Sequence, residues 1–142
     1  MLYLLILTDP ELSYDGYTED FPIGIFETEK QAEETACYYL AHVKGFCDFP
    51  CTYRIIEKEI VGYSDNMTDC VWIVQGWNVN EHLDETDIIE SACFLTEAQA
   101  NTELQVMKSS YQRTEWAVNC WQIGALEWRE GFVRMVGGQP VN

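Results

Sequence analysis

Two acidic stretches hold the residues of this 142-residue chain that are best suited to chemistry or binding. Residues 9–20 contain five carboxylates and residues 80–87 contain four, and neither stretch has a Lys or Arg. Carboxylates in such numbers can coordinate a divalent cation or engage a cationic surface. Aromatic residues, which often anchor protein interfaces, accompany them. The predicted partner-binding residues are Asp9, Glu11, Tyr14, Asp15, Tyr17, Glu19, Asp20, Glu81, Asp84, Glu85 and Asp87.

The charge of the whole chain is strongly negative. It has 24 acidic and 8 basic residues, a formal net charge of -16, so at least 16 carboxylates have no basic side chain with which to pair. Residues 1–29 hold seven acids and residues 59–107 hold ten, without a single Lys or Arg in either range. A protein of this charge repels phosphate groups, which argues against direct binding to nucleic acid and to membrane surfaces.

Three explanations of the acidity stay open. Solubility is the simplest, because a large net charge needs no partner. Docking on a basic protein surface, above all a nucleic-acid-binding channel, explains why the acids cluster in two loops, and electrostatic steering would speed such association. Cation binding by the four carboxylates of residues 80–87 is the third, although the EF-hand spacing is missing. We expect docking, with no metal or other cofactor.

No catalytic motif accompanies the acidic stretches. The nucleophile-elbow, phosphate-loop, dinucleotide-binding and zinc-protease motifs do not occur in the sequence. His42 lies beside the expected buried face of a helix, and His82 lies among carboxylates that favour its protonated form. We expect His42 to be a residue at the boundary of the core and not a base, and His82 has no identifiable nucleophile or oxyanion donor beside it. We therefore expect a non-enzymatic protein, with a metal-dependent hydrolase built on the acidic loops as the alternative.

The cysteines and the N-terminus bear on the compartment. We expect the six cysteines to be free thiols, most of them in apolar surroundings. Cys47 and Cys51 are the closest pair, but no second pair or nearby histidine completes a zinc spacing. The apolar run 1–7 carries no basic residue and is too short for a signal peptide or a membrane span. These features predict a cytosolic protein.

A repeated motif defines the elements that must position the acidic loops. F-x-T-E-x-Q-A occurs at residues 26–32 and again 68 positions later at 94–100. In each copy a threonine followed three residues later by glutamine predicts a capping box at a helix start. Apolar residues then continue at helical spacing and in the same register, which indicates an internal duplication. These residues are Ala32, Ala36, Tyr39 and Val43 in the first copy and Ala100, Leu104, Met107 and Tyr111 in the second.

Apolar runs predict three strands around each helix. The expected strands are 3–8, 23–26 and 53–61 in the first repeat, and 71–76, 91–94 and 116–123 in the second, with a further strand at 132–136. Each repeat, 1–64 and 69–136, is therefore strand-strand-helix-strand. We expect an α+β fold in which 1–142 form a single compact domain, with antiparallel or mixed sheets, two helices on one layer and a pseudo-twofold axis. Pairing of the third strands of two chains would give a homodimer.

The helix entry at Phe26 to Ala32 and at Phe94 to Ala100 resembles that of small, functionally uncharacterised proteins of bacteria and their phages. The motif covers 14 of the 142 residues and implies only the fold. In size and acidity the chain is also similar in character to phage-encoded inhibitors of host defence, anti-CRISPR proteins among them, several of which imitate the charge of nucleic acid. This likeness implies an inhibitor that docks on the nucleic-acid-binding surface of a partner protein.

Overall fold

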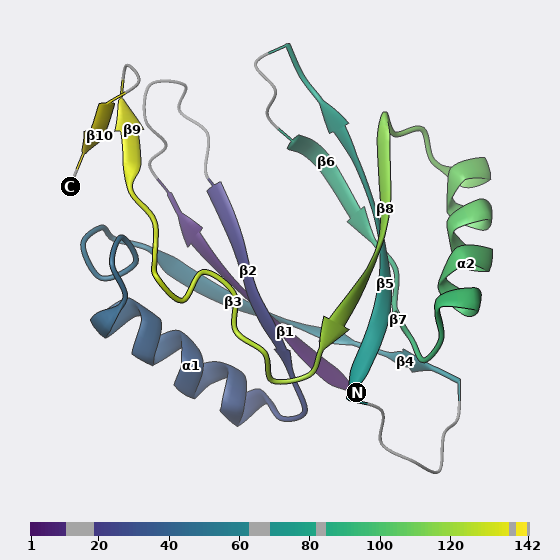
Figure 1. Cartoon of the computed structure of the whole chain (residues 1–142), viewed down its shortest axis with the longest axis horizontal. Helices are drawn as coiled ribbons and strands as arrows, with labels where there is room; N and C mark the ends of the chain where they lie inside the picture. The colour runs from purple at the N-terminus through teal and green to yellow at the C-terminus, as the bar shows by residue number, and fades with distance from the viewer. Residues whose placement is uncertain (11–18, 63–68, 82–84, 137–138, 142) are drawn as a thin grey trace. The chain divides into compact units, whose positions relative to one another are not determined.

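The computed structural model describes residues 1–10, 19–62, 69–81, 85–136 and 139–141 (Figure 1). Within these ranges it has two helices and antiparallel and mixed sheets, which confirms the predicted α+β class. The chain divides into two compact units. Unit 1 comprises residues 1–57 and 124–142, and unit 2 comprises residues 58–123.

The bounds of these units differ from those of the predicted repeats. The second repeat was expected to run to residue 136, whereas residues 124–136 belong to unit 1. Backbone hydrogen bonds explain this placement: Gly124 N–H donates to the Ile25 carbonyl at 2.8 Å, and Glu127 N–H donates to the Ile23 carbonyl at 2.7 Å. Two backbone N–H groups of the segment thus donate to carbonyl groups of the second strand of unit 1.

Unit 1 is a three-stranded sheet with a helix on one face. β1 (Leu2–Asp9) lies between β2 (Glu19–Phe26) and β3 (Thr52–Lys58), and β1 and β2 are antiparallel. α1 (Glu29–His42) packs on β1 and β2 (Figure 1). A short hairpin of β9 (Arg134–Val136) and β10 (Gln139–Val141) follows at the C-terminal end, where a strand at 132–136 was expected. The core contains Leu5, Leu7, Phe21, Ile23, Phe26, Ala32, Ala36, Tyr39, Val43 and Phe46.

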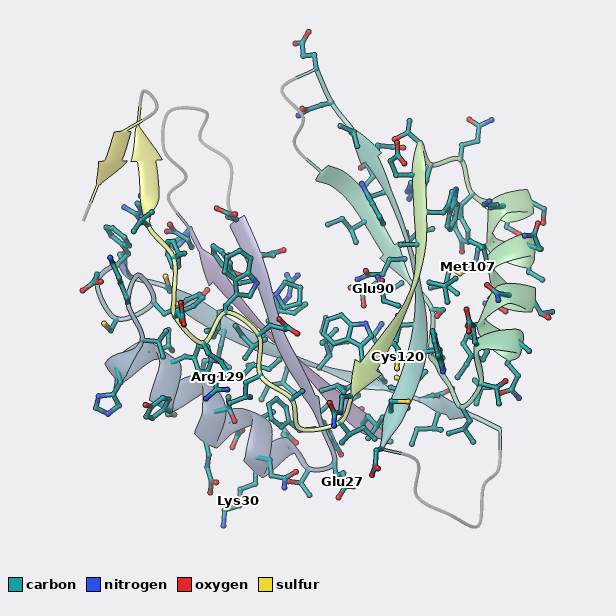
Figure 2. The ribbon with its side chains drawn as sticks, in the orientation of Figure 1. Glu27, Lys30, Glu90, Met107, Cys120 and Arg129 are labelled. Atoms are coloured by element: carbon teal, nitrogen blue, oxygen red, sulfur yellow. The ribbon has the colours of Figure 1, made fainter. Side chains whose placement is uncertain are left out.

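Unit 2 repeats this plan with a broken second strand. β5 (Cys70–Val79) pairs antiparallel with β8 (Glu115–Gln122), with β6 (Glu85–Glu90) and with β7 (Cys93–Phe94). β4 (Ile60–Val61) adds a parallel pairing to β7. α2 (Glu97–Ser110) packs on β5, β7 and β8 (Figure 1). Val74, Phe94, Ala100 and Met107 form the core, and Figure 2 shows Met107 between α2 and the sheet.

The helix starts confirm the prediction from the repeated motif. Both helices are 14 residues long, and their first residues, Glu29 and Glu97, are 68 positions apart. At Thr28 the capping box is complete, because its hydroxyl accepts from Gln31 N–H while the Gln31 side chain accepts from Thr28 N–H. Thr96 also accepts from the third residue's N–H, at 3.2 Å, but the side chain of Gln99 bonds to the Thr96 hydroxyl instead of its backbone N–H.

The buried helix faces agree with the prediction except at one position. Ala100 and Met107 are buried and Leu104 is half-buried, but Tyr111, expected on the same face, is 50% exposed. Tyr111 is the C-cap of α2 and has an extended backbone (φ -132, ψ 139), so its side chain leaves the helical face. Val43 is the matching cap of α1, yet it stays buried because the chain that follows packs Phe46 into the same core. Helical spacing therefore predicts burial only as far as the helix extends.

Candidate functional site

The acidic stretches occupy equivalent positions in the two units. The first joins the C-terminal end of β1, at Asp9, to the start of β2, at Glu19. The second joins the C-terminal end of β5, at Val79, to the start of β6, at Glu85. In each unit the acidic stretch therefore begins at the C-terminal end of the strand that pairs with the other strands of its repeat. This strand is β1, which pairs with β2 and β3, in unit 1, and β5, which pairs with β6, β7 and β8, in unit 2. This placement was expected for loops between matching strands.

Several predicted residues lie outside the part of the chain that the structure describes. These are Glu11, Tyr14, Asp15, Tyr17 and Asp84, and for Glu85 only the backbone is described. Glu19, Asp20, Glu81 and Asp87 are described and exposed. The described carboxylates therefore flank the two loops at the ends of their strands.

Asp9 is not an exposed binding residue, which corrects its assignment to the partner-binding set. Its exposure is 0%, and its carboxylate accepts two hydrogen bonds from Arg134, with Nε 2.8 Å from Oδ2. The guanidinium also lies 3.6 Å from the centre of the Phe49 ring. A bidentate pair with a stacked guanidinium satisfies a carboxylate that is withdrawn from water. Asp9 thus holds the C-terminal segment of unit 1 to the end of β1.

Asp20 and Asp87 each have local partners as well as exposure. The Thr8 hydroxyl donates to Asp20 Oδ1 at 2.7 Å, and Arg54 Nη2 lies 3.1 Å from Oδ2. The Asp87 carboxylate accepts from Asn78 Nδ2 at 3.0 Å, and the residue has a left-handed backbone with φ 53. These contacts fix where the two carboxylates lie on the ends of the strands without burying them.

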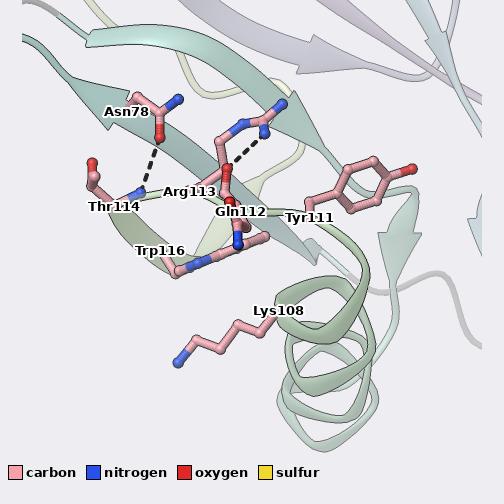
Figure 3. A pocket seen from close by; sticks show the side chains of 7 residues that line it. All are labelled: Asn78, Lys108, Tyr111, Gln112, Arg113, Thr114 and Trp116. Atoms are coloured by element: carbon pink, nitrogen blue, oxygen red, sulfur yellow. Dashed lines mark hydrogen bonds between the residues drawn. The ribbon is translucent and has the colours of Figure 1, made fainter.

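A pocket of about 630 Å³ lies in unit 2 where α2 ends and β8 begins (Figure 3). Arg113 is fixed there by two neutral acceptors, since its Nε donates to the Asp87 carbonyl at 2.6 Å and its Nη1 donates to the Gln112 carbonyl at 2.8 Å. Thr114 N–H donates to Asn78 Oδ1 at 3.1 Å. The lining residues are Asn78, Lys108, Tyr111, Gln112, Arg113, Thr114 and Trp116.

The charged side chains that line this pocket are both basic. Unit 2 has three basic residues, and Lys108 and Arg113 both line the pocket. Lys108 lies in the last turn of α2, where a positive charge stabilises the negative end of the helix dipole. The lining contains no carboxylate, histidine or cysteine among the described residues, so the pocket offers attraction for an anion without the usual acid-base pairs of an active site.

Sequence reasoning missed this pocket. Tyr111 was assigned to a buried helix face and Trp116 to a strand predicted from an apolar run, but Tyr111 is exposed and Trp116 is only half-buried. A signal was available, because residues 59–107 lack Lys and Arg and the next ten residues then include Lys108 and Arg113 on either side of the helix end. Only the tertiary structure brings Asn78 of β5 to the same place.

The cysteines are more exposed than expected. All six are free, but only Cys93 is buried, whereas Cys37, Cys47 and Cys120 are exposed. Burial raises the pKa of Cys93 to about 11, against the effect of the Lys58 ammonium. Burial likewise raises the pKa of Cys51 to about 11, and the Asp9 carboxylate adds to it. Thiols with such pKa values are poor nucleophiles at neutral pH.

Among the residues that the structure describes, no three or more His, Cys, Asp or Glu side chains are grouped so that they could hold a metal ion. Neither α1 nor α2 is long and apolar enough to cross a membrane. The described part of the acidic loops therefore does not bring together a cation site.

Known proteins give no further assignment of this site. Comparison of the chain with family models, with curated proteins and with solved structures gave no match.

Proposed function

We propose that this protein is a non-enzymatic binding protein whose two acidic loops dock on a basic surface of a partner protein. The docking residues are those of the predicted set without Asp9, which is held by Arg134. In its concrete form the protein is an inhibitor that occupies a nucleic-acid-binding surface of its partner. The likeness in character to phage-encoded anti-defence proteins implies the same role.

The observation that carries the proposal is the distribution of charge over the two units. Unit 1 has 13 acidic and 5 basic residues, and unit 2 has 11 and 3, so each has a net charge of -8. Each unit also carries an acidic loop at the same end of its equivalent strand. Solubility alone does not require this clustering, because scattered charges keep a protein in solution equally well.

Electrostatics favours a protein partner with a basic groove. A DNA duplex carries about one negative charge per 1.7 Å of axis, and a groove that binds it is lined with Lys and Arg. Grouped carboxylates can occupy such a groove because they present several negative charges to its Lys and Arg side chains. At physiological ionic strength the Debye length is about 8 Å, so neighbouring carboxylates in one loop act together while distant ones are screened.

The test is a comparison of two variants of unit 2 with equal charge changes. The loop variant carries Glu81→Gln, Asp84→Asn and Glu85→Gln, and the control carries Glu59→Gln, Glu97→Gln and Glu103→Gln. Association with purified DNA-binding proteins is measured by stopped flow across a salt series, with and without competing duplex DNA. We expect the association rate of the loop variant to fall about tenfold or more and its salt dependence to flatten, because steering is lost.

Three outcomes would contradict the proposal. Equal effects of the two variants would show that only the net charge matters. Binding that duplex DNA does not displace would exclude occupation of the nucleic-acid site. A melting temperature that rises with Ca²⁺, Mg²⁺ or Mn²⁺ in the unmodified protein, and not in the loop variant, would instead assign the loops to a cation.

A further inference from the structure

Two cysteines of unit 2 lie on neighbouring antiparallel strands. Cys70 is the first residue of β5 and is opposite Gln122, while Cys120 of β8 is opposite Trp72. The two cysteines therefore occupy diagonal positions, because Cys120 lies two residues along β8 from Gln122, the residue directly opposite Cys70. Because side chains alternate between the faces of a strand, Cys70 and Trp72 share a face, and Cys120 shares it too. Both thiols thus project from one side of the sheet.

The two thiols are neighbours on this face. Diagonal positions of an antiparallel pair lie close enough for their side chains to interact, and Glu97 at the start of α2 also interacts with Cys120. Partial burial, the neighbouring Cys70 thiol and the Glu97 carboxylate all raise the pKa of Cys120. Cys120 is exposed and Cys70 is half-buried, so a small oxidant in solution can reach the pair from the Cys120 side. Figure 2 labels Cys120 on β8.

The remaining cysteines do not offer an equivalent pair. Cys47 and Cys51 are close in sequence, but their sulfurs bond elsewhere, to Asp48 Oδ1 and to the Gly45 carbonyl. Cys93 is fully buried, and Cys37 is exposed on α1. Among the described contacts, only Cys70 and Cys120 join two thiols.

We propose that Cys70 and Cys120 are an oxidation site that forms a reversible disulfide with a small disulfide such as oxidised glutathione as the oxidant. The thiolate of Cys120, whose proportion increases at alkaline pH because the pKa of this thiol is raised, attacks one glutathione sulfur. The S–S bond of the oxidant breaks, and one glutathione thiolate leaves. The Cys70 thiolate then attacks Cys120 of the mixed disulfide and releases the second glutathione. The protein loses two electrons, and its two thiol protons end on the two glutathione molecules.

The disulfide would link β8 covalently to Cys70, the first residue of β5. The chain between the two cysteines contains β6, β7 and α2, so the bond closes a long loop that spans most of unit 2. Closing a long loop restricts the unfolded chain and stabilises the folded one. The oxidised protein is therefore expected to melt several degrees above the reduced protein, and a reductant such as dithiothreitol should reverse the shift.

The test incubates the full-length protein with oxidised glutathione and maps its peptides by mass spectrometry without reduction. We expect a linked peptide pair that contains Cys70 and Cys120 and lacks two hydrogen atoms. Cys70→Ser should instead retain a glutathione adduct on Cys120, because the resolving thiol is gone. Cys37→Ser, which removes an exposed thiol of unit 1, is the matched control and should form the link as the unmodified protein does.

The proposal is overturned if the unmodified protein gives only glutathione adducts, or if the link joins Cys47 to Cys51. It is also overturned if the oxidised protein melts no higher than the reduced one, since the bond would then not fit the folded sheet. None of these outcomes depends on whether the acidic loops bind a partner.

Discussion

Arg134 shows how one residue far along the chain can change the role of another. Its guanidinium takes Asp9 out of the acidic surface, although 125 positions separate the two residues. Only 15% of the Arg134 side chain and 1% of the Asp9 side chain are exposed. Each charge is therefore stabilised mainly by the other and not by water. Removing one partner of a buried pair leaves the other charge without compensation, which is more damaging than losing both.

We predict that Arg134→Met destabilises the protein by about 3 to 5 kcal/mol, because a buried carboxylate would lose its partner. Urea unfolding followed by circular dichroism measures the change. Adding Asp9→Asn to this variant should restore part of the loss, since no unpaired charge then remains. Lys30→Met, at the exposed pair with Glu34, is the control and should change stability little. A small effect of Arg134→Met would show that Asp9 is solvated in some other way.

At the scale of elements, local sequence and local structure agree closely at the helix starts. Thr28 and Thr96 satisfy N–H groups that have no partner within their helices. The strands agree less closely. The second strand of unit 2 was expected at 91–94, but it begins earlier, as β6 at Glu85, and is interrupted at Ser91 and Ala92 before β7. The Ser91 hydroxyl accepts from Val74 N–H at 2.9 Å and so supplies the bond that a continuous ladder would otherwise make.

We predict that Thr28→Ala and Thr96→Ala each destabilise the protein by about 1 kcal/mol, because each removes a helix N-cap. The loss should be larger at Thr28, where the capping box is complete. The midpoint of chemical unfolding measures both changes. Thr35→Ala is the control, since Thr35 lies inside α1 and its hydroxyl donates to the Gln31 carbonyl instead of capping the helix start. Alanine favours the helix interior, so a loss at Thr35 equal to that at Thr28 would argue against a specific capping effect.

For the whole molecule, the main physical feature is uncompensated negative charge. The excess of 16 carboxylates is divided equally between the two units. Like charges on a folded surface repel, and the repulsion is relieved when the chain expands. Exposed pairs such as Lys30 with Glu34 offset little of this repulsion because they are well solvated. The fold must therefore be held by its apolar cores in spite of its surface charge.

We predict that the melting temperature rises as ionic strength increases from about 0.01 M to 0.15 M, because the Debye length falls from about 30 to 8 Å and screens the repulsion. Differential scanning calorimetry in NaCl, KCl and choline chloride measures the shift. The three salts should act alike, since screening does not depend on the identity of the cation. An increase with one cation alone would contradict screening and would indicate specific binding.

The sequence by itself determined the fold class, the two helices and their caps, and the position of each acidic loop between two strands. These features depend on contacts within a few residues or on a hydrophobic period, and both are visible in a linear chain. The 68-residue offset predicted where the second helix begins, because the same local signals recur there.

The tertiary structure alone decided which residues of the candidate site are available and which assist the fold. The pairing of Asp9 with Arg134, the pocket between Asn78 and Arg113, and the meeting of Cys70 and Cys120 all join residues that are far apart in the sequence. No periodicity marks such pairs, because they follow from the register of strands and the path of the C-terminal segment. The placement of residues 124–136 in unit 1 has the same origin, since long-range backbone hydrogen bonds to β2 set it.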